Sequence, residues 1–396
     1  MNIVVLSNMY PNSVTYRSGI FVHEQVKELI KLGVKVTVIA PIAYSPKLLN
    51  WFKDEWKEYR KIPFVENIEN VKVYHPRFLA IPRGYFKEYW GYIYAITAGR
   101  IIKKILVQEK IDILHAHGGL PDDFGTYLIS KKFNIPYVLT VHGAAVYAGQ
   151  RIEPQFKKSE IAINNADRVV GVSNIILARI KKFTGRTQGV SCIYNGYKRN
   201  EIELDSESVK SNNIKILFAG SLIERKGLKY LLEAFSELIK KYKNIQLLVA
   251  GGGIIKDRME EICDNLNIKH NVEFTGLVSH KRMLGEIQNC DIFILPSWDE
   301  AFGVVYLEAM SMKKPTVGTE NEGISDFIID GKNGFLVKPR DSKSIVEKLS
   351  KLIEDQNLRA EFGEVGFETI KDLTWKRNAE ETLNVYSNIL NQSNNV

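Results

Sequence analysis

The amino-acid sequence predicts an α/β protein built from two doubly wound domains in tandem, each a parallel sheet covered by helices. Short runs rich in β-branched residues end in small or turn residues, and a helical segment follows most of them. These runs are apolar without alternation, which is typical of strands buried on both faces. The pattern stops near residue 200 and restarts near residue 214, in a chain of 396 residues that is long for one core.

The first domain is expected over residues 1–200. Its predicted strands are residues 3–7, 36–40, 111–115, 137–141, 168–172 and 191–194. Residues 201–213 contain few apolar side chains and show no periodicity, so this segment is interpreted as the linker between the domains.

The second domain is expected over residues 214–373, with strands at residues 214–219, 245–250, 272–275, 292–295, 315–318 and 334–337. In the remaining residues, 374–396, the segment 374–390 is long enough for a helix that leaves the second domain and packs on the first. Open α/β sheets bind ligands beyond the carboxyl ends of their strands. Two facing sheets therefore predict a site in a cleft between the domains, with domain closure as a gate.

Composition excludes several classes of protein. Hydrophobic residues at 45% and charged residues at 25% are globular values, and no run of about 18 apolar residues predicts a spanning helix. The three cysteines, Cys192, Cys263 and Cys290, are scattered and match neither a disulfide framework nor a metal-binding spacing. The first apolar run has no basic leader and is interpreted as a strand. A cytoplasmic protein with buried thiols is therefore expected.

Positive charge is concentrated in the first half of the chain. Residues 1–205 hold 29 Lys and Arg against 18 Asp and Glu, a balance of +11, whereas the remainder holds 25 against 28, a balance of −3. An anionic membrane surface, a phosphorylated acceptor or a nucleic acid could each be a partner for the basic half. No nucleic-acid-binding motif accompanies the charge, so no nucleic-acid partner is expected.

The most specific motif is Glu-Ala-Phe-Gly-Val-Val-Tyr-Leu-Glu-Ala-Met at residues 300–310. It follows a buried strand and should start a helix at Gly303, whose free backbone N–H groups can hold a phosphate. Glu300 can reach ligand hydroxyls from the loop, and Glu308, about one and a half turns into the helix, can accept bonds from ribose hydroxyls. Two glutamates alone would more often be solvated side chains of an ordinary βα unit.

The surroundings of the pair favour function, because they resemble the donor-site motif of the retaining glycosyltransferases of family 4. That motif has two Glu residues separated by seven residues around Phe-Gly, and the resemblance continues through residues 311–318 and 322–328. Residues 220–228 are similar to the family's phosphate-binding segment, and residues 250–253 and 274–277 fall at its nucleotide-binding turns. The resemblance covers nearly the whole chain. It implies the GT-B architecture, with two Rossmann-like domains and a C-terminal helix that crosses back to the first.

This resemblance implies site roles in the second domain. Lys226 and Arg225 are expected to neutralise the donor diphosphate, whose negative charge grows in the transition state. Many family members have Arg where this chain has Ser221, so Arg225 is a candidate substitute and Ser221 a candidate hydroxyl contact. Glu300 is expected to contact hydroxyls of the donor sugar, and Glu308 the ribose. The other candidate donor-binding residues are Gly252, Gly276 and Leu277, at the nucleotide, and Phe302, Gly303, Val304 and Val305, near the sugar and phosphates.

In the first domain, Gly19 resembles the glycine of the family's opening loop, where a missing side chain lets the backbone approach the diphosphate. Thr-Val-His-Gly at residues 140–143 is similar to an element whose His lies against the donor sugar, so His142 is a candidate catalytic residue, although not assigned as a base. A further set is open to two interpretations, an acceptor pocket or a structural role: His115, His117, Asp122 and Asp123. No acidic spacing or cluster predicts a metal site, so no metal or other cofactor is expected.

The resemblance implies metal-independent transfer of a hexosyl group with retention, in which the leaving diphosphate helps to deprotonate the acceptor on the same face. The expected donor is a UDP- or GDP-type nucleotide sugar. The opening of the chain and residues 298–303 look most like enzymes of bacterial surface-polysaccharide assembly, including those of the teichuronic-acid type. A glycan acceptor is therefore expected.

A segment of the first domain suggests a membrane partner. Residues 82–94, followed by Arg100, Lys103 and Lys104, combine aromatic and basic side chains in a predicted helix. Such a segment can lie at an anionic membrane surface. Together with the basic first half, it suggests peripheral membrane contact and a lipid-linked acceptor. The alternative is an ordinary aromatic-rich helix packed on the sheet.

Three other functions compete with this interpretation. A nicotinamide dehydrogenase should show Gly-x-Gly-x-x-Gly after the first strand, and residues 7–11 do not provide it. A nucleotide-sugar epimerase of the same architecture would use the donor without an acceptor. A catalytically silent relative would bind the donor only, and the presence of Glu300, Glu308 and Lys226 together favours a transferase over it.

Overall fold

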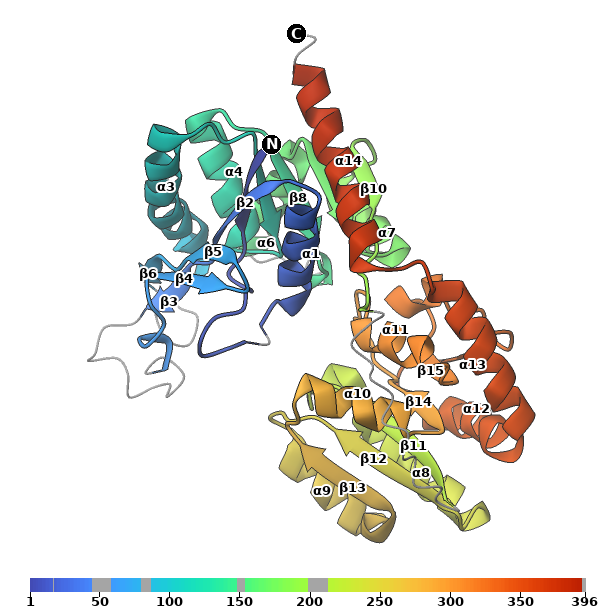
Figure 1. Ribbon diagram of the computed structural model, residues 1–396. Coiled ribbons are helices and arrows are strands. Elements are labelled where there is room, and N and C mark those ends of the chain that lie inside the picture. Colours follow the sequence, from blue (N-terminus) through green and yellow to red (C-terminus); the bar gives the residue numbers. More distant parts are fainter. Residues whose placement is uncertain (17, 45–57, 80–86, 148–153, 199–212, 394–396) are drawn as a thin grey trace. The chain divides into compact units, whose positions relative to one another are not determined.

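The computed structural model describes residues 1–16, 18–44, 58–79, 87–147, 154–198 and 213–393 (Figure 1). It divides into two compact units, the first made of residues 1–195 and 375–396 and the second of residues 196–374. The two chain segments at the boundary of the second unit are joined to each other: the N–H of Tyr197 donates to the carbonyl oxygen of Leu373 at 3.1 Å. The predicted linker, residues 201–213, lies outside the described residues apart from Asn213.

The main sheet of the first unit has the strand order β10-β9-β8-β7-β1-β2-β5-β4. Neighbouring strands are parallel except for the antiparallel edge pair of β4 and β5. The strands are β1 Asn2–Leu6, β2 Lys35–Ile39, β4 Val65–Ile68, β5 Val71–Tyr74, β7 Ile113–His117, β8 Tyr137–Val141, β9 Arg168–Gly171 and β10 Val190–Cys192. β3, Ile42–Tyr44, and β6, Arg77–Leu79, pair separately.

The six strands predicted for this unit are confirmed, with a shift in β7. Its ladder to β1 starts at the pair Ile3 and Ile113, and the preceding residue, Asp112, accepts the N–H of Asn2 at 2.8 Å. β7 therefore extends to His117 instead of ending at residue 115. The short strands β3 to β6 were not predicted. β4 and β5 are joined by two residues of positive φ, Glu69 and Asn70, which form a tight hairpin turn.

Helices connect the strands of this sheet: α1 Ile20–Lys31, α3 Trp90–Gln108, α4 Asp122–Phe133, α5 Ala144–Tyr147, α6 Pro154–Asn165 and α7 Asn174–Thr184. α1 links β1 to β2, whereas α4 links β7 to β8 in the opposite direction along the sheet. Since such crossovers are right-handed, the two helices cover opposite faces. In the part of the chain that the structure describes, no helix is long and apolar enough to cross a bilayer.

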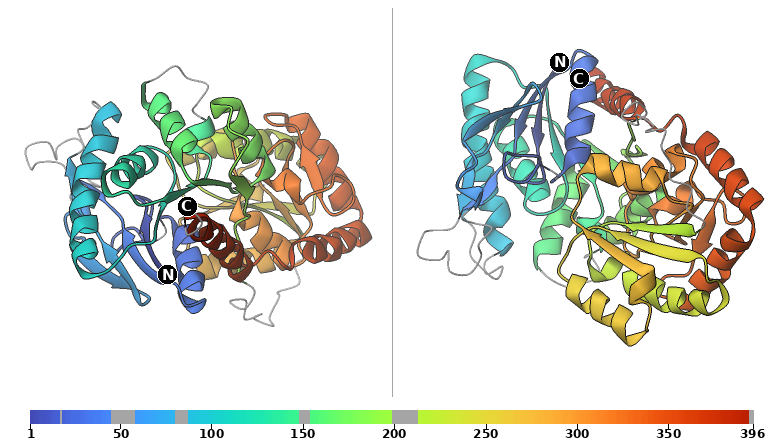
Figure 2. Two further views of the ribbon diagram at one scale, coloured as in Figure 1. Left: turned by 90° about the horizontal axis from the view of Figure 1, so that it is seen from above. Right: turned by 60° about the horizontal axis from the view of Figure 1, so that its bottom comes forward.

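The last helix, α14 at Trp375–Ser393, belongs to the first unit, as predicted for the C-terminal segment. It lies beside α1 in each view (Figures 1 and 2), and side chains of both helices share one core. In that contact Gln25 Nε2 of α1 donates to Asn378 Oδ1 at 2.6 Å and to Thr382 Oγ1 at 3.2 Å. The chain thus ends on the unit in which it began.

The second unit has a fully parallel sheet in the order β13-β12-β11-β14-β15-β16. Its strands are β11 Ile214–Ala219, β12 Ile245–Ala250, β13 Val272–Gly276, β14 Ile292–Ile294, β15 Thr316–Thr319 and β16 Phe335–Val337, and all six were predicted. Its α-helices are α8 Leu228–Lys241, α9 Lys256–Asn265, α10 His280–Gln288, α11 Val304–Ser311, α12 Ser342–Glu354 and α13 Gln356–Ile370. This strand order is that of a Rossmann-type sheet made of two mononucleotide-binding halves.

Candidate functional site

Each main sheet has one place where its order of winding reverses. It lies between β11 and β14 in the second unit and between β1 and β7 in the first. At such a point the loops after the two strands turn away from each other and leave a crevice for a ligand. The predicted site residues of both units cluster after these strands.

The loops after β11, β12 and β13 approach one another closely. The N–H of Leu222 donates to the carbonyl oxygen of Gly252 at 2.9 Å, and that of Gly251 to Gly276 at 3.1 Å. A Cβ on Gly251 would lie 1.9 Å from the carbonyl oxygen of Gly220, so this approach requires glycine. The contacts bring Gly252 next to Leu277, whose side chain is 76% exposed and available to a ligand.

Lys226 and Arg225 lie on a short 3-10 helix, Glu224–Lys226, directly after this loop. Lys226 forms an ion pair with the carboxylate of Glu300, and the guanidinium of Arg225 lies 3.4 Å from the same oxygen. The side chains of Lys226 and Glu300 are 13% and 11% exposed, so water screens their pairing weakly. The predicted diphosphate-binding cations and the predicted sugar-binding carboxylate are therefore one connected cluster. Ser221 is exposed at the start of the same loop.

The loop that carries Glu300 is held by a residue to which the sequence assigned no role. Both carboxylate oxygens of Glu322 accept backbone N–H groups, from Asp299 and Glu300, each at 2.9 Å. Glu322 is 6% exposed, and Asp299 has a φ of 53°, a conformation that non-glycine residues seldom adopt. Glu322 thus fixes the direction of Glu300. The only signal in the sequence was its place within the matched stretch 322–328.

Helix α11 begins as predicted. Gly303 is its N-cap with a φ of 78°, and a Cβ there would lie 2.6 Å from the ring of Tyr306. Val304 and Val305 form the first turn and are partly exposed, and the N–H groups of a first turn have no partner within their own helix. Phe302 is buried and stacks edge-on against Phe327 with ring centroids 5.7 Å apart, which anchors the loop.

Glu308 has a partner that the sequence did not reveal. Its Oε1 lies 2.8 Å from Nε2 of His280, the first residue of α10, and the two side chains are 16% and 54% exposed. α10 starts after β13, so His280 reaches the same edge of the sheet as α11. The sequence analysis did not predict this partner; the signal nearest to it is Ser279, a residue type favoured as an N-cap, which caps α10 directly before His280.

In the first unit, Gly19 caps α1 with a φ of 62°, and a Cβ there would lie 1.9 Å from the carbonyl oxygen of Met9. Glycine is therefore required for the loop after β1 to fold back on itself. Two residues later, the ring of Phe21 lies against the ring of His142, with centroids 4.5 Å apart. The loops after β1 and β8 thus meet at this end of the sheet.

Three histidines stack at the carboxyl ends of β7 and β8. His117 Nδ1 lies 3.1 Å from His142 Nε2, and His115 Nε2 lies 2.8 Å from Thr140 Oγ1. Burial lowers the pKa of His142 to about 3 and that of His115 to about 3, and it holds the pKa of His117 well below its usual value. At neutral pH all three rings are uncharged, and His142 can exchange hydrogen bonds with a ligand without bringing charge.

Of the two alternatives left open for the acidic pair, internal bonding favours the structural role. Asp122 accepts the N–H of Asn8 at 2.7 Å, Asp123 accepts that of Phe124 at 2.6 Å, and both side chains are at most 2% exposed. Burial raises the pKa of Asp123 to about 6 and that of Asp122 well above its usual value. In the described residues, no group of three or more His, Cys, Asp or Glu is arranged to hold a metal ion.

The second unit therefore brings together Ser221, Arg225, Lys226, Gly252, Gly276, Leu277, Glu300, Phe302, Gly303, Val304, Val305 and Glu308 at one edge of its sheet. Gly19 and His142 lie at the corresponding edge of the first unit. We call these two sets of residues the half-sites of the second and the first unit. Chemically, the larger one offers two cations, a helix start and two carboxylates, a set suited to a diphosphate and to sugar hydroxyls.

Comparison with known proteins gives concordant matches. Residues 18–201 match the family model described as Glycosyltransferase Family 4, and residues 200–369 match that described as Glycosyl transferases group 1. The putative teichuronic acid biosynthesis glycosyltransferase TuaC of Bacillus subtilis is 27% identical over 382 residues, 94% of each chain. Sucrose-phosphate synthase of Thermosynechococcus elongatus has a TM-score of 0.83 at 18% identity, covering 99% of this chain and 100% of its own. Anabaena HepE, solved with UDP and glucose, has a TM-score of 0.73 at 17% identity, covering 98% and 100%.

Proposed function

The chain belongs to glycosyltransferase family 4 and has the GT-B fold, and on this premise we propose that it is a retaining, metal-independent hexosyltransferase. Its donor is a nucleotide-diphosphate sugar of the UDP or GDP type, and its acceptor is a glycan. The reaction serves the assembly of a cell-surface polysaccharide. The name of TuaC, which refers to teichuronic acid biosynthesis, supports that role. The UDP and glucose bound to HepE favour UDP over GDP as the nucleotide of the donor.

The observation that carries the proposal is the cluster of Lys226, Arg225 and Glu300 between β11 and β14, beside the start of α11. When the glycosidic bond to the leaving group breaks, negative charge builds up on the diphosphate. Two cations and the N–H groups of a helix start, already in place, stabilise that charge without a metal ion. Glu300 then exchanges part of its contact with the cations for the hydroxyls of the donor sugar.

The proposed retention does not use a covalent enzyme intermediate. The carboxylate of Glu300 pairs with Lys226 and Arg225, and its backbone N–H donates to Glu322. Glu300 is therefore poorly placed to act as a free nucleophile. In the proposed reaction the acceptor hydroxyl attacks from the face that the diphosphate leaves, and a phosphate oxygen takes the hydroxyl proton. The protein contributes positioning and charge stabilisation. His142, neutral through burial, contributes a hydrogen bond to the donor sugar.

The acceptor and the location form the second part of the proposal. A lipid-linked glycan on the cytoplasmic side of a membrane fits a chain with an excess of basic residues in its first half. Cys263 and Cys290 are buried thiols that form no disulfide, which agrees with a reducing compartment.

The test of the donor site is a thermal-shift titration with UDP, GDP, ADP, CMP and their sugar conjugates, in EDTA and then with Mg²⁺. We expect stabilisation by one nucleotide diphosphate in EDTA, and its loss in Lys226→Ala. Lys229→Ala is the matched control, because it removes the same charge from α8, where Lys229 pairs only loosely with Glu233 at 3.8 Å. A flat screen, or equal loss in both variants, would contradict the donor site.

Product analysis tests the reaction class. With donor and acceptor together, NMR of the product should show the anomeric configuration of the donor, and inversion would rule out the mechanism. Conversion of the donor sugar in the absence of acceptor would identify an epimerase. Binding of the donor without transfer to any acceptor glycan would identify a silent relative.

A further inference from the structure

Helix α3 of the first unit presents an unusual outer face. Its inner side buries Tyr94, Ile102 and Ile105 completely or nearly so. Its outer side carries residues spaced by three or four, and therefore aligned along the helix: Tyr92, Ile96, Arg100, Lys103 and Val107. Ile96 is 58% and Val107 82% exposed, and α3 contains no acidic residue. Exposed apolar and basic side chains thus share one helical face.

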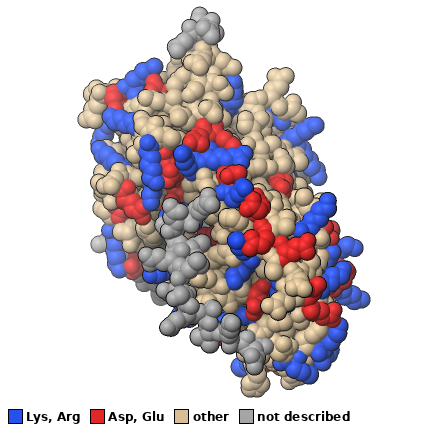
Figure 3. Space-filling model, turned by 45° about the vertical axis from the view of Figure 1, so that its right-hand side comes forward, with Lys and Arg blue, Asp and Glu red and all other residues tan. Residues whose placement is uncertain are grey.

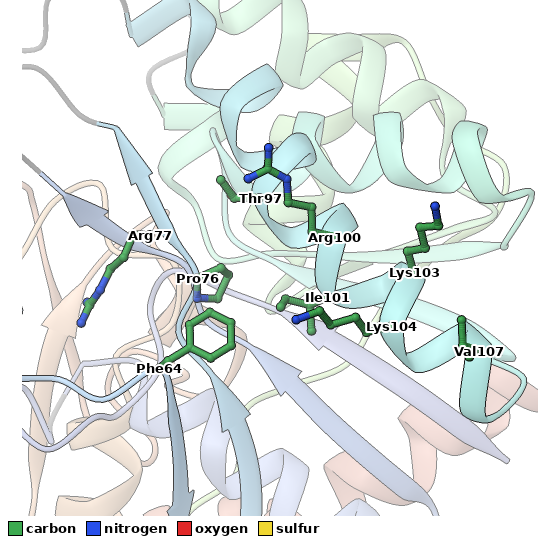
Figure 4. A pocket seen from close by; sticks show the side chains of 9 residues that line it. All are labelled: Phe64, Pro76, Arg77, Thr97, Arg100, Ile101, Lys103, Lys104 and Val107. Carbon is green, nitrogen blue, oxygen red and sulfur yellow. The ribbon is translucent and has the colours of Figure 1, made fainter.

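Beside this face lies a pocket of about 480 Å³, which is lined by Phe64, Pro76, Arg77, Thr97, Arg100, Ile101, Lys103, Lys104 and Val107 (Figure 4). Phe64 and Pro76 belong to the segments flanking β4 and β5, and the residues from Thr97 onward belong to α3. The side chain of Lys104 extends toward Phe64 in Figure 4. The pocket therefore combines an apolar wall with basic groups at its rim.

Three of its basic groups are available to a ligand. Arg77 is already used, since its guanidinium donates to the carbonyl oxygens of Tyr59 and Ile62. Arg100, Lys103 and Lys104 are exposed, and within the described residues no carboxylate lies within 4 Å of their charged nitrogens. By contrast, both signs of charge intermingle over the face drawn in Figure 3. Three unneutralised cations around one pocket form a site for an anion.

We propose that this α3 surface, defined as Tyr92, Ile96, Arg100, Lys103, Lys104 and Val107, docks on an anionic bilayer, with a lipid phosphate at the basic pocket. A free phosphate would explain the cations but not the exposed Ile96 and Val107. A bilayer uses both, because its headgroups attract the cations while apolar side chains enter the layer below. The surface is distinct from both half-sites and extends the proposed function by holding the enzyme where a lipid-linked acceptor lies.

The size of the effect follows from the number of charges. A basic side chain near an anionic membrane surface contributes about fivefold to partitioning onto that membrane. The double variant Lys103→Gln/Lys104→Gln should therefore partition about 25-fold more weakly onto anionic vesicles. Both lysines are exposed on the outer side of α3, so the substitutions should leave the fold intact.

A matched control exists in the same unit. Lys181 and Lys182 are also consecutive exposed lysines near the end of a helix, α7, and α7 packs beside β9 and β10 at the far edge of the sheet from the pocket. The variant Lys181→Gln/Lys182→Gln removes the same charge from the protein. It should bind anionic vesicles like the parent chain.

The experiment is vesicle flotation of the full chain with phosphatidylcholine vesicles, with and without phosphatidylglycerol, at low and at physiological salt. We expect binding only with phosphatidylglycerol, the 25-fold loss in the Lys103/Lys104 variant, no loss in the control, and a several-fold loss in Ile96→Ser. Absence of binding by the parent chain, or equal loss in the two double variants, overturns the proposal. Binding of inorganic phosphate in calorimetry, with no binding to vesicles, identifies a soluble anion site and also overturns it.

Failure of this proposal is separable from failure of the proposed function. Stabilisation by a nucleotide diphosphate reports on the second unit and should be the same in the Lys103→Gln/Lys104→Gln variant as in the parent. If nucleotide binding is normal while vesicle binding is absent, the docking surface alone is refuted. If vesicle binding follows the expected pattern while nucleotides do not bind, only the donor site is refuted.

Discussion

The contact of Glu322 with the loop that carries Glu300 leads to the most specific prediction. Its carboxylate accepts two adjacent backbone N–H groups, of Asp299 and Glu300, at 2.9 Å each. In Glu322→Gln one carboxylate oxygen becomes an NH₂ group, which cannot accept either bond. One of the two buried N–H groups then faces the NH₂ group of the glutamine and has no acceptor. The other keeps its hydrogen bond, but the bond is weaker because its acceptor no longer carries a negative charge.

The magnitude can be worked out from these contacts. A hydrogen bond to a charged group contributes about 1.5–3 kcal/mol, and a buried donor left unpaired costs about 1–3 kcal/mol, so the variant should lose about 2–4 kcal/mol of unfolding free energy. For a domain of the size of the second unit, residues 196–374, 1 kcal/mol corresponds to about 2–4 °C in Tm. The Tm should therefore fall by about 5–15 °C.

The loop should also lose its function. Asp299 has a φ of 53°, which Glu322 helps to maintain, so Glu300 should move when the contact is weakened. Misplacement of about 1 Å can cost about 100-fold in rate. We expect kcat to fall by about 10- to 100-fold, with a smaller change in KM.

Calorimetry of the unfolding transition and steady-state transfer kinetics measure the two effects. Glu320→Gln is the control, because Glu320 lies two residues away and is partly exposed. If Glu322→Gln unfolds within about 2 °C of that control and keeps its rate, the two bonds do not hold the loop, and the reasoning is refuted.

Three further predictions concern other parts of the two half-sites. Gly303→Ala should cost about 1–3 kcal/mol in calorimetric stability and weaken donor binding, since its φ is 78° and buried Tyr306 leaves no room for a Cβ; an unchanged Tm would contradict this. Glu308→Gln should raise the Kd for the nucleotide about tenfold in calorimetric titration, through weaker bonds to the ribose, and an unchanged Kd would exclude that contact. In the folded chain the pKa of His115 is lowered to about 3, whereas in the unfolded chain it is about 6.5. Below pH about 6.5 only the unfolded chain binds a proton at this ring, so the stability of the folded chain falls as the pH drops. Urea unfolding at pH 7.5 and 5.0 should show about 2 kcal/mol less acid loss in His115→Gln than in the parent chain, and equal losses would refute it.

Local patterns in the amino-acid sequence were sufficient to predict most of the strands. Each of the twelve predicted strands has a counterpart in the structure, because apolar runs without alternation mark strands buried on both faces. The strands missed, β3 to β6, are short and lie outside the central ladder, and β4 alternates exposed and partly buried residues. The pairing of β4 with β5 depends on a two-residue turn of positive φ at Glu69 and Asn70, which neither residue type predicts.

The candidate site residues also divide into those that the sequence indicated and those that only the structure revealed. The sequence alone determined the two Rossmann-type sheets and the helix start at Gly303, because these depend on patterns within a few residues. Its resemblance to family 4 indicated the candidate residues Lys226, Glu300 and Glu308. Only the tertiary structure decided that Lys226 neutralises a carboxylate 74 residues away, and that Glu322 holds the backbone of Glu300. It also decided that His280 faces Glu308. Such contacts join loops from different strands, and their partners are selected by the order of strands in the sheet, which spacing along the chain does not encode.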